Sequence, residues 1–246
     1  MIIAVCNQKG GQGKTTTAQA IATGAAQIGR KSLAIDFDPQ GNLTFSMGGN
    51  GADVGAYELI TGKTTPGQTI QRTRQGDLIA ASGSLALADT TFTGETRTNA
   101  LKTALRPIKK KYDVITIDCP PTLNTLLINA LTAADTVIIP LTADIYALQG
   151  LYQLKQSIEA AQKLNPALQI GGVVFTRHSI RTILSRDLTD VITDKCRELD
   201  IPVYKTVIRE GVAVREAQTQ RESLFTYAPK SKPAKDYMQL IKEINL

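Results

Sequence analysis

Short apolar runs rich in β-branched residues recur along the chain and predict the strands of a sheet. Several runs, such as IIAV at 2–5 and TVIIPL at 136–141, are apolar at nearly every position. This pattern is typical of parallel strands that helices cover on both faces. The expected strands are 2–5, 32–37, 77–82, 113–118, 136–141, 170–176 and 203–208.

Segments with a helical spacing of apolar residues lie between these runs. The expected helices include 15–28, 97–110, 145–163, 184–198 and 230–244. Residues 41–76 are rich in Gly, Thr and Gln and predict loops and a short helix. Alternating strands and helices predict an α/β fold: a doubly wound, mostly parallel sheet with helices on both faces, which binds ligands at the carboxyl ends of its strands.

Length and composition narrow the possible classes of protein. The chain has 246 residues, of which 42% are hydrophobic, so we expect a single domain over residues 1–246. The formal net charge of +6 indicates either a polyanionic partner or a basic surface that serves solubility alone. The N-terminal apolar run is too short for a signal sequence, and no segment approaches the roughly 18 apolar residues of a membrane span. We therefore expect a cytoplasmic protein.

The three cysteines, Cys6, Cys119 and Cys196, stand far apart in the sequence with no CxxC pair. This spacing favours reduced thiols over a disulfide framework or a cysteine metal site. Cys119 follows a carboxylate at a predicted strand end, where a redox residue or a cluster ligand is the alternative. It has no partner at metal-ligand spacing, so we interpret it as structural.

The stretch QKGGQGKTT at 8–16 follows the first predicted strand and fits a phosphate-binding loop. The usual pattern is GxxxxGK[ST], and only its end matches here, because Gln8 stands where the first glycine belongs. Lys14 is expected to bridge the β- and γ-phosphates, and the Thr15 hydroxyl to ligate Mg²⁺. The glycines that let backbone N–H groups turn toward phosphate oxygens are Gly10, Gly11 and Gly13.

The same stretch resembles the deviant Walker A motif, KGGxGKT, of the ParA/MinD/Soj ATPases, which are P-loop NTPases. The resemblance makes Lys9 the signature lysine, which reaches across a dimer to the ATP of the other subunit. Gln12 replaces the more usual valine. The residues that the resemblance assigns to the nucleotide are Lys9, Gly10, Gly11, Gln12, Gly13, Lys14, Thr15, Thr16 and Arg177.

Two predicted strands end in carboxylates. LAIDFDPQGN places Asp36 and Asp38 after the second strand and resembles the DxDPQGN switch I of the family, which implies that Asp38 orients the attacking water and that Asp36 helps to hold the metal and the loop. YDVITIDCPP is a Walker B pattern, and we expect Asp118 to hold Mg²⁺ through water. The expected catalytic residues are Lys9, Lys14 and Asp38, and the expected metal residues are Thr15, Asp36 and Asp118.

The resemblance extends over nearly the whole chain and is strongest to the short ParA/Soj branch, with no room for an N-terminal helix-turn-helix. It implies an ATPase, with ATP and Mg²⁺ as cofactors, that partitions a plasmid or chromosome. ATP would join two subunits into a homodimer that binds DNA without sequence preference. A ParB-like centromere-binding partner would stimulate hydrolysis, and the protein would be associated with the nucleoid.

The resemblance locates the DNA-binding surface only in part. Arg181, in SIRT, matches an arginine that the Soj branch uses for DNA, but two other basic positions of the family fall on Ala213 and Glu210. Each candidate is also open to interpretation as a solvated surface charge. The candidates are Arg181, Arg186, Arg209, Arg215, Lys230 and Lys232, with Arg221 and Lys235 nearby.

Two other classes of protein remain as alternatives. A MinD-like positioning ATPase would bind membrane through a C-terminal amphipathic helix, but the charges of AKDYMQLIKEINL cancel, which favours a core-facing helix and no membrane partner. The second alternative is a metabolic enzyme of this fold, such as an iron-protein reductase or a biotin-pathway ligase. The reductase needs paired cluster cysteines, which are missing here, and the ligase gives no role to Lys9.

Overall fold

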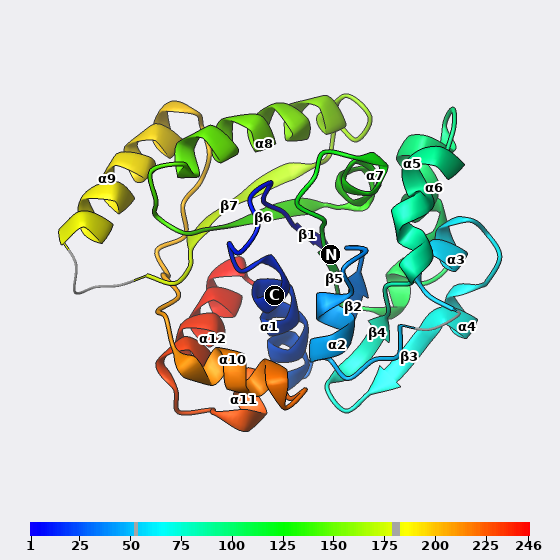
Figure 1. The fold of residues 1–246 in the computed structure, drawn as a ribbon, viewed down its shortest axis with the longest axis horizontal. Helices are drawn as coiled ribbons and strands as arrows, with labels where there is room; N and C mark the ends of the chain where they lie inside the picture. Colours follow the sequence, from blue (N-terminus) through cyan, green and yellow to red (C-terminus); the bar gives the residue numbers. More distant parts are fainter. Residues whose placement is uncertain (52–53, 179–182) are drawn as a thin grey trace.

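A computed structural model describes residues 1–51, 54–178 and 183–246, with residues 183–186 described by their backbone alone. Its centre is a seven-stranded sheet of order β3-β4-β2-β5-β1-β6-β7 (Figure 1). Neighbouring strands are parallel except for the antiparallel hairpin β3–β4. The strands are β1 (Ile2–Val5), β2 (Ser32–Asp36), β3 (Ile70–Thr73), β4 (Gly76–Ile79), β5 (Val114–Asp118), β6 (Thr136–Leu141) and β7 (Gln169–Phe175). The predicted doubly wound, mostly parallel sheet is confirmed.

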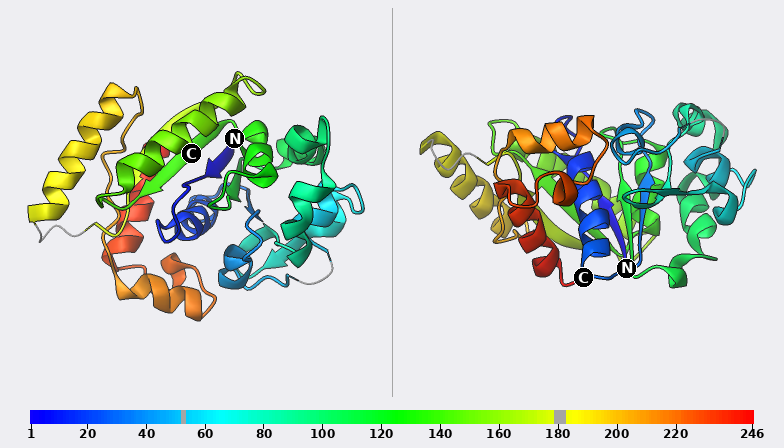
Figure 2. Two further views of the ribbon diagram at one scale, coloured as in Figure 1. Left: turned by 45° about the horizontal axis from the view of Figure 1, so that its top comes forward. Right: turned by 90° about the horizontal axis from the view of Figure 1, so that it is seen from below.

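Helices cover both faces of the sheet (Figures 1 and 2). One layer holds α6 (Thr96–Leu105), α7 (Thr125–Ala133) and α8 (Ala147–Gln162), with α9 (Ile183–Glu198) at the edge of the molecule beside α8. The other layer holds α1 (Lys14–Gln27), α10 (Val212–Thr219), α11 (Leu224–Tyr227) and α12 (Lys232–Ile244). Successive residues of β1 alternate between the two cores, with Ile2 and Ala4 facing the first layer and Ile3 and Val5 the second.

The last helix faces the core, as its sequence predicts. Tyr237, Leu240 and Ile241 of α12 are at most 2% exposed and pack beneath α1. An interfacial membrane helix needs a free apolar face, and here that face is covered. Within the described ranges, no helix combines the length and the apolar character needed to cross a bilayer.

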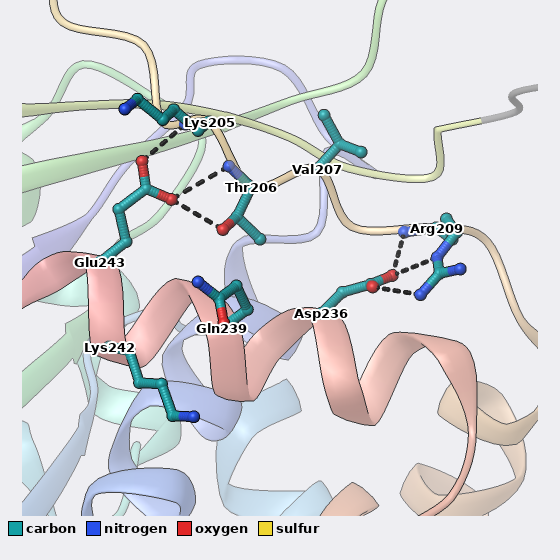
Figure 3. Close-up of a pocket in the computed structure, with 8 residues that line it drawn as sticks. All are labelled: Lys205, Thr206, Val207, Arg209, Asp236, Gln239, Lys242 and Glu243. Atoms are coloured by element: carbon teal, nitrogen blue, oxygen red, sulfur yellow. Dashed lines mark hydrogen bonds and ion pairs between the residues drawn. The ribbon is translucent and has the colours of Figure 1, made fainter.

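Two sequence predictions are wrong. Residues 203–208 do not form a strand. They run beside β7 and contact it through a bridge at Val203 and a hydrogen bond from Ile208 N to Phe175 O. Between these points the N–H groups of Lys205 and Thr206 donate to the Glu243 carboxylate of α12 instead of to β7 (Figure 3). Residues 41–76 hold more structure than loops and one helix. They form β3 and the short helices α2 (Asn42–Ser46), α3 (Ala56–Ile60) and α4 (Pro66–Thr69), each too short to show a period in the sequence. The remaining short helix, α5 (Ala88–Thr91), follows this region.

Gly24 sets how closely α1 and α12 approach, and Gly24→Ala is expected to destabilise the fold. A Cβ at this position would overlap Ile241 Cδ1 and lie 2.9 Å from Phe225 Cε2. Overpacking of this kind costs about 1–3 kcal/mol, more than the roughly 0.5–1 kcal/mol that alanine gains over glycine inside a helix. Denaturant unfolding measures the change. Gly150→Ala in α8 is the matched control, because no heavy atom lies within 4 Å of the added Cβ, and it should stabilise; equal effects of the two substitutions would contradict this account.

Candidate functional site

Three adjacent strands bring the predicted site residues to one edge of the sheet. The β2–β5 register pairs Asp36 with Asp118, and the β1–β5 register pairs Val5 with Asp118. The loop that leaves β1 therefore begins beside both carboxylates. The sequence expectation that phosphate loop and acidic strand ends share one edge is confirmed.

The loop at 7–13 has the backbone of a phosphate-binding loop. Gly11 and Gly13 have φ angles of +74° and +85°, in the left-handed region that glycine adopts without strain. Asn7 Oδ1 accepts a hydrogen bond of 2.9 Å from Lys9 N and so holds the start of the turn. Helix α1 begins immediately after the loop, at Lys14, so its unpaired N-terminal N–H groups and positive dipole end face the loop.

A cavity of about 670 Å³ opens above this loop. The predicted nucleotide residues other than Lys9 and Gln12 line it, together with the predicted catalytic carboxylate, Asp38. Its lining includes Gly10, Gly11, Gly13, Lys14, Thr15, Thr16, Asp38 and Arg177. Arg177 lies two residues after the end of β7 and has a positive φ of 50°, so the chain turns sharply there as it leaves the sheet.

The cavity also contains residues that the sequence reasoning missed. Asn42 and Ser46 come from α2, and Gln218 and Thr219 from α10. Gln218 Nε2 donates to Thr16 Oγ1 at 3.1 Å, which ties α10 to the first turn of α1. The sequence signal for Asn42 is its place in DPQGN, whereas the α10 residues lie some two hundred positions from the loop and carry no local signal.

Lys14 is 8% exposed, and its Nζ donates to the carbonyl oxygen of Lys9 at 3.3 Å. Its side chain therefore curls back over the loop, where it faces the same space as the loop N–H groups. A buried ammonium with a single long hydrogen bond to a neutral carbonyl is poorly compensated. The Asp118 carboxylate lies near enough to act on this charge, and an anion held by the loop would compensate it further.

Asp118 is a buried carboxylate that the Thr15 hydroxyl and the Lys14 charge compensate only in part. Among the residues that the structure describes, neither of its oxygens has a hydrogen-bond partner. Burial, and next the charge of Asp36, hold the pKa of Asp118 well above its usual range, and these effects outweigh Thr15 and Lys14 beside it. A divalent cation beside Asp118 would stabilise the ionised carboxylate and lower its pKa, so Asp118 and Thr15 fit a Mg²⁺ site. No cluster of three or more His, Cys, Asp or Glu side chains forms a metal site within the described ranges, so water and phosphate would complete the shell.

Asp36 differs from Asp118 because its oxygens are engaged. Oδ2 accepts hydrogen bonds from Thr44 N at 2.6 Å and from Thr44 Oγ1 at 2.7 Å, and Oδ1 accepts one from Asp38 N at 3.3 Å. Burial raises its pKa to about 6 even so. Asp36 thus anchors the loop that carries Asp38. Its role as a metal residue stays a prediction.

Asp38 lies at the wall of the cavity and is 7% exposed. Its Oδ1 accepts a hydrogen bond of 3.0 Å from Gln40 N, and its carbonyl accepts one of 3.0 Å from Gly41 N. This turn fixes the direction of the carboxylate. A carboxylate held rigidly at the wall of a phosphate cavity can orient a water and accept its proton.

Lys9 lies apart from the cavity. Its Nζ forms an ion pair of 2.6 Å with Asp144 Oδ2 and lies 5.3 Å from the centre of the Tyr146 ring. Asp144 and Tyr146 belong to the loop between β6 and α8. The two lysines of the loop therefore point to different places: Lys14 lines the cavity, and Lys9 faces a neighbouring surface.

The contacts of Gln12 give a structural reason for a glutamine where the family pattern more usually has valine. It is 3% exposed, and its Oε1 accepts a hydrogen bond of 2.7 Å from Thr142 N. Its carbonyl accepts another, of 2.9 Å, from Thr176 Oγ1. The side chain thus ties the phosphate loop to the end of β6, a link that valine cannot make, whereas the bond to Thr176 after β7 is accepted by the backbone and does not depend on the residue type.

The predicted DNA residues lie in several places. Arg181 falls outside the described residues, and so does the side chain of Arg186. Arg209 Nε and Nη2 bind the Asp236 carboxylate of α12 (Figure 3), so its charge is already paired. Arg215 is exposed and lines the phosphate cavity. Lys230 and Lys232 are exposed at the start of α12.

Comparisons with known proteins agree with this geometry. A family model described as an AAA domain matches residues 1–170. The chain is 40% identical to the sporulation initiation inhibitor protein Soj of Bacillus subtilis, over 99% of this chain and 97% of Soj. It is 37% identical to the chromosome-partitioning ATPase Soj of Treponema pallidum, over 97% of this chain and 94% of that protein.

The fold is likewise similar to solved structures. The crystal structure of cobyrinic acid a,c-diamide synthase from Mycobacterium smegmatis, with a bound ATP analogue and magnesium, has a TM-score of 0.85 and 34% identity, covering 98% of this chain and 92% of that one. Both Soj proteins match at higher identity over nearly the full length. The chain therefore belongs to the Soj/ParA family of partition ATPases, within the ParA/MinD-type ATPases.

Proposed function

We propose that this ATPase partitions DNA as an ATP-dependent dimer, which binds DNA without sequence preference and releases it when a ParB-like partner stimulates hydrolysis. The observation that carries the proposal is the position of Lys9. Lys14 and the loop line the cavity of their own subunit, where they would hold its phosphates, whereas Lys9 lies at the surface in a pair with Asp144. A cation in this position is available to a second subunit.

The surface around Lys9 has the character of an interface. Leu123, Ile145 and Tyr146 are 60%, 72% and 61% exposed. Tyr146 lies against Lys9, and Leu123 lines a hollow together with Gln8. Exposed large apolar side chains beside a charged residue are typical of protein contact sites. Leu123 follows Asp118 by five residues, and Ile145 and Tyr146 flank the Lys9–Asp144 pair. A second copy of the chain that covers this surface would bring each Lys9 toward the cavity of the other subunit.

We assign each site residue a separate role in ATP hydrolysis. The mycobacterial structure holds an ATP analogue and magnesium, and the cavity, Lys14, Thr15 and Asp118 here support the same ligands. Mg²⁺ would supply positive charge to the phosphate oxygens. Lys14 and the loop N–H groups hold the triphosphate, Asp38 orients the attacking water, and Lys9 of the partner subunit adds a cation at the phosphates.

Lys9→Ala tests the dimer. Each Lys9 would exchange an exposed ion pair, worth about 0–1 kcal/mol, for a charge-assisted bond to phosphate worth roughly 1.5–3 kcal/mol, and a two-fold dimer makes the exchange twice. The substitution should weaken ATP-dependent dimerisation by at least about fivefold and leave ATP binding intact. The measurement is analytical ultracentrifugation with saturating ATP, in protein whose hydrolysis is blocked by Asp38→Ala.

Asp144→Asn is the matched control for Lys9. It releases Lys9 without removing it, so dimerisation should be as tight as in the parent protein or tighter. Equal dimerisation with and without Lys9 would leave the lysine as an ordinary loop residue and remove the main support for the proposal.

Charge supports DNA as the partner of the dimer. Lys230 and Lys232 flank Ser231, the N-cap of α12, so two cations and a positive helix end lie together. Log affinity for duplex DNA should fall linearly with log salt, with a slope of about 0.9 per neutralised phosphate. Replacing Lys230 and Lys232 by alanine should lower the slope by about 0.9 for each phosphate that the variant no longer neutralises, equally on every DNA sequence.

Co-sedimentation of the ATP-bound protein with plasmid DNA across a salt series measures this slope. Lys63→Ala is the control, because Lys63 is exposed and follows α3, in another part of the molecule. Sedimentation with anionic liposomes instead of DNA would indicate a membrane-positioning ATPase. A strong preference for one DNA sequence would contradict non-specific binding.

A further inference from the structure

Cys6 and Cys119 are separated by 113 positions in the sequence but lie side by side in the structure. The β1–β5 register pairs Ala4 with Ile117 and Val5 with Asp118, so the two cysteines are the next pair along the same strands. They face the same core as Ala4 and Ile117. The Cys6 thiol donates to Cys119 Sγ, with the two sulfur atoms 3.0 Å apart.

This pair lies between the two parts of the ATP site. Cys6 precedes Asn7, whose side chain holds Pro140 O and Lys9 N and so sets the start of the phosphate loop. Cys119 directly follows Asp118, the unpaired carboxylate that fits Mg²⁺. A displacement of either sulfur that side-chain rotation does not absorb would therefore act on the loop or on the Asp118 carboxylate through one peptide unit.

We propose that Cys6 and Cys119 form a reversible disulfide that switches off ATP turnover under peroxide stress. This rests on the proposed function of the site. A peroxide oxidises one thiol to a sulfenic acid and leaves as water; the other thiol attacks that sulfur, and a second water leaves. Two thiols and one hydrogen peroxide thus give one disulfide and two waters, and a thiol reductant reverses the change.

A Cys6–Cys119 disulfide would draw the ends of β1 and β5 together and so distort the ATP site. A disulfide holds its sulfur atoms about 2.05 Å apart, so the pair must close by roughly 1 Å from its present separation. A misplacement of about 1 Å in a catalytic site can lower the rate by roughly 10²-fold. Both thiols are fully buried, and burial raises the pKa of Cys119 well above its usual range, so oxidation should be slow and needs a small peroxide that reaches the pair when the strand ends open locally.

The test treats the reduced, folded protein with hydrogen peroxide, blocks the remaining thiols, and maps linked peptides by mass spectrometry without reduction. We expect a Cys6–Cys119 peptide and a fall in ATP turnover of at least about tenfold that dithiothreitol restores. Cys6→Ala should abolish the sensitivity to peroxide, with turnover compared to its own untreated sample, and Cys119→Ser serves if Cys6→Ala does not fold. Cys196→Ala, which alters the third thiol, in α9, should keep the sensitivity.

Three outcomes would overturn the proposal: no linked peptide, a linked peptide with unchanged turnover, or equal loss of turnover in Cys6→Ala. The peptide map does not depend on ATP hydrolysis. A protein that forms the Cys6–Cys119 bond but hydrolyses no ATP when reduced would contradict the proposed function, whereas an active protein without the bond would contradict only the switch.

Discussion

Lys14→Ala is expected to abolish ATP binding at concentrations that saturate the parent protein. Lys14 is 8% exposed and lies over the phosphate loop, so its charge acts on a bound triphosphate with little screening. Removing one partner of a buried ion pair costs about 3–5 kcal/mol, and each 1.4 kcal/mol is a factor of ten. The dissociation constant should therefore rise by roughly a hundredfold to several thousandfold, as measured by isothermal titration calorimetry.

Two other lysines separate this effect from a general loss of charge. Lys163 is exposed at the end of α8, and Lys163→Ala, which removes the same charge far from the cavity, should bind ATP normally. Lys9→Ala should also bind ATP, because Lys9 is paired with Asp144 away from the cavity. An unchanged affinity in Lys14→Ala would mean that the loop N–H groups alone hold the phosphates.

The position of the site could be predicted from the sequence because it depends on few rules. Apolar runs indicate the order of strands and helices, and ligands gather where parallel strands end. The loop glycines and the carboxylates at the ends of β2 and β5 therefore had to meet at one edge, and the register Asp36–Asp118 confirms it. No side-chain geometry was needed for this step.

The roles within the site could not be separated in the same way. Asp36 and Asp118 each end an apolar strand, and nothing in their local sequence distinguishes them. Their difference arises from Thr44, which donates twice to Asp36, whereas Asp118 has no such donor among the described residues. A contact made from α2, eight positions after Asp36, therefore distinguishes the two carboxylates.

Long-range contacts also explain the expectations that were wrong or incomplete. The run at 203–208 is apolar enough for a strand, but Glu243 takes its N–H groups from 38 and 37 positions away. Arg209 carries a charge that suits DNA, yet Asp236 of the same helix as Glu243 neutralises it. Cys119 has no partner by spacing, but the fold supplies Cys6. Each of these contacts follows from how α12 or β5 docks, which periodicity does not encode.

Asp38→Ala is expected to leave ATP binding intact and to slow hydrolysis. The carboxylate lies at the cavity wall, held by Gln40 N, and it is separate from the loop groups that bind phosphate. Loss of a positioned base lowers the rate by roughly 10²- to 10⁴-fold, so turnover under saturating ATP should fall by this factor while the affinity measured by calorimetry changes little. Asp190→Ala, which removes an exposed carboxylate of α9, is the control and should hydrolyse ATP at the parent rate.

The proposed dimer adds a second expected result, because slow hydrolysis should prolong the ATP-bound state. Asp38→Ala should therefore accumulate as a dimer in ATP and stay on DNA, whereas the parent protein should return to monomer as ATP is consumed. If Asp38→Ala hydrolyses ATP at the parent rate, the water must be oriented by another group. Gln218 and Asn42 are then the next candidates, because both line the same cavity and carry amides that can hold a water without accepting its proton.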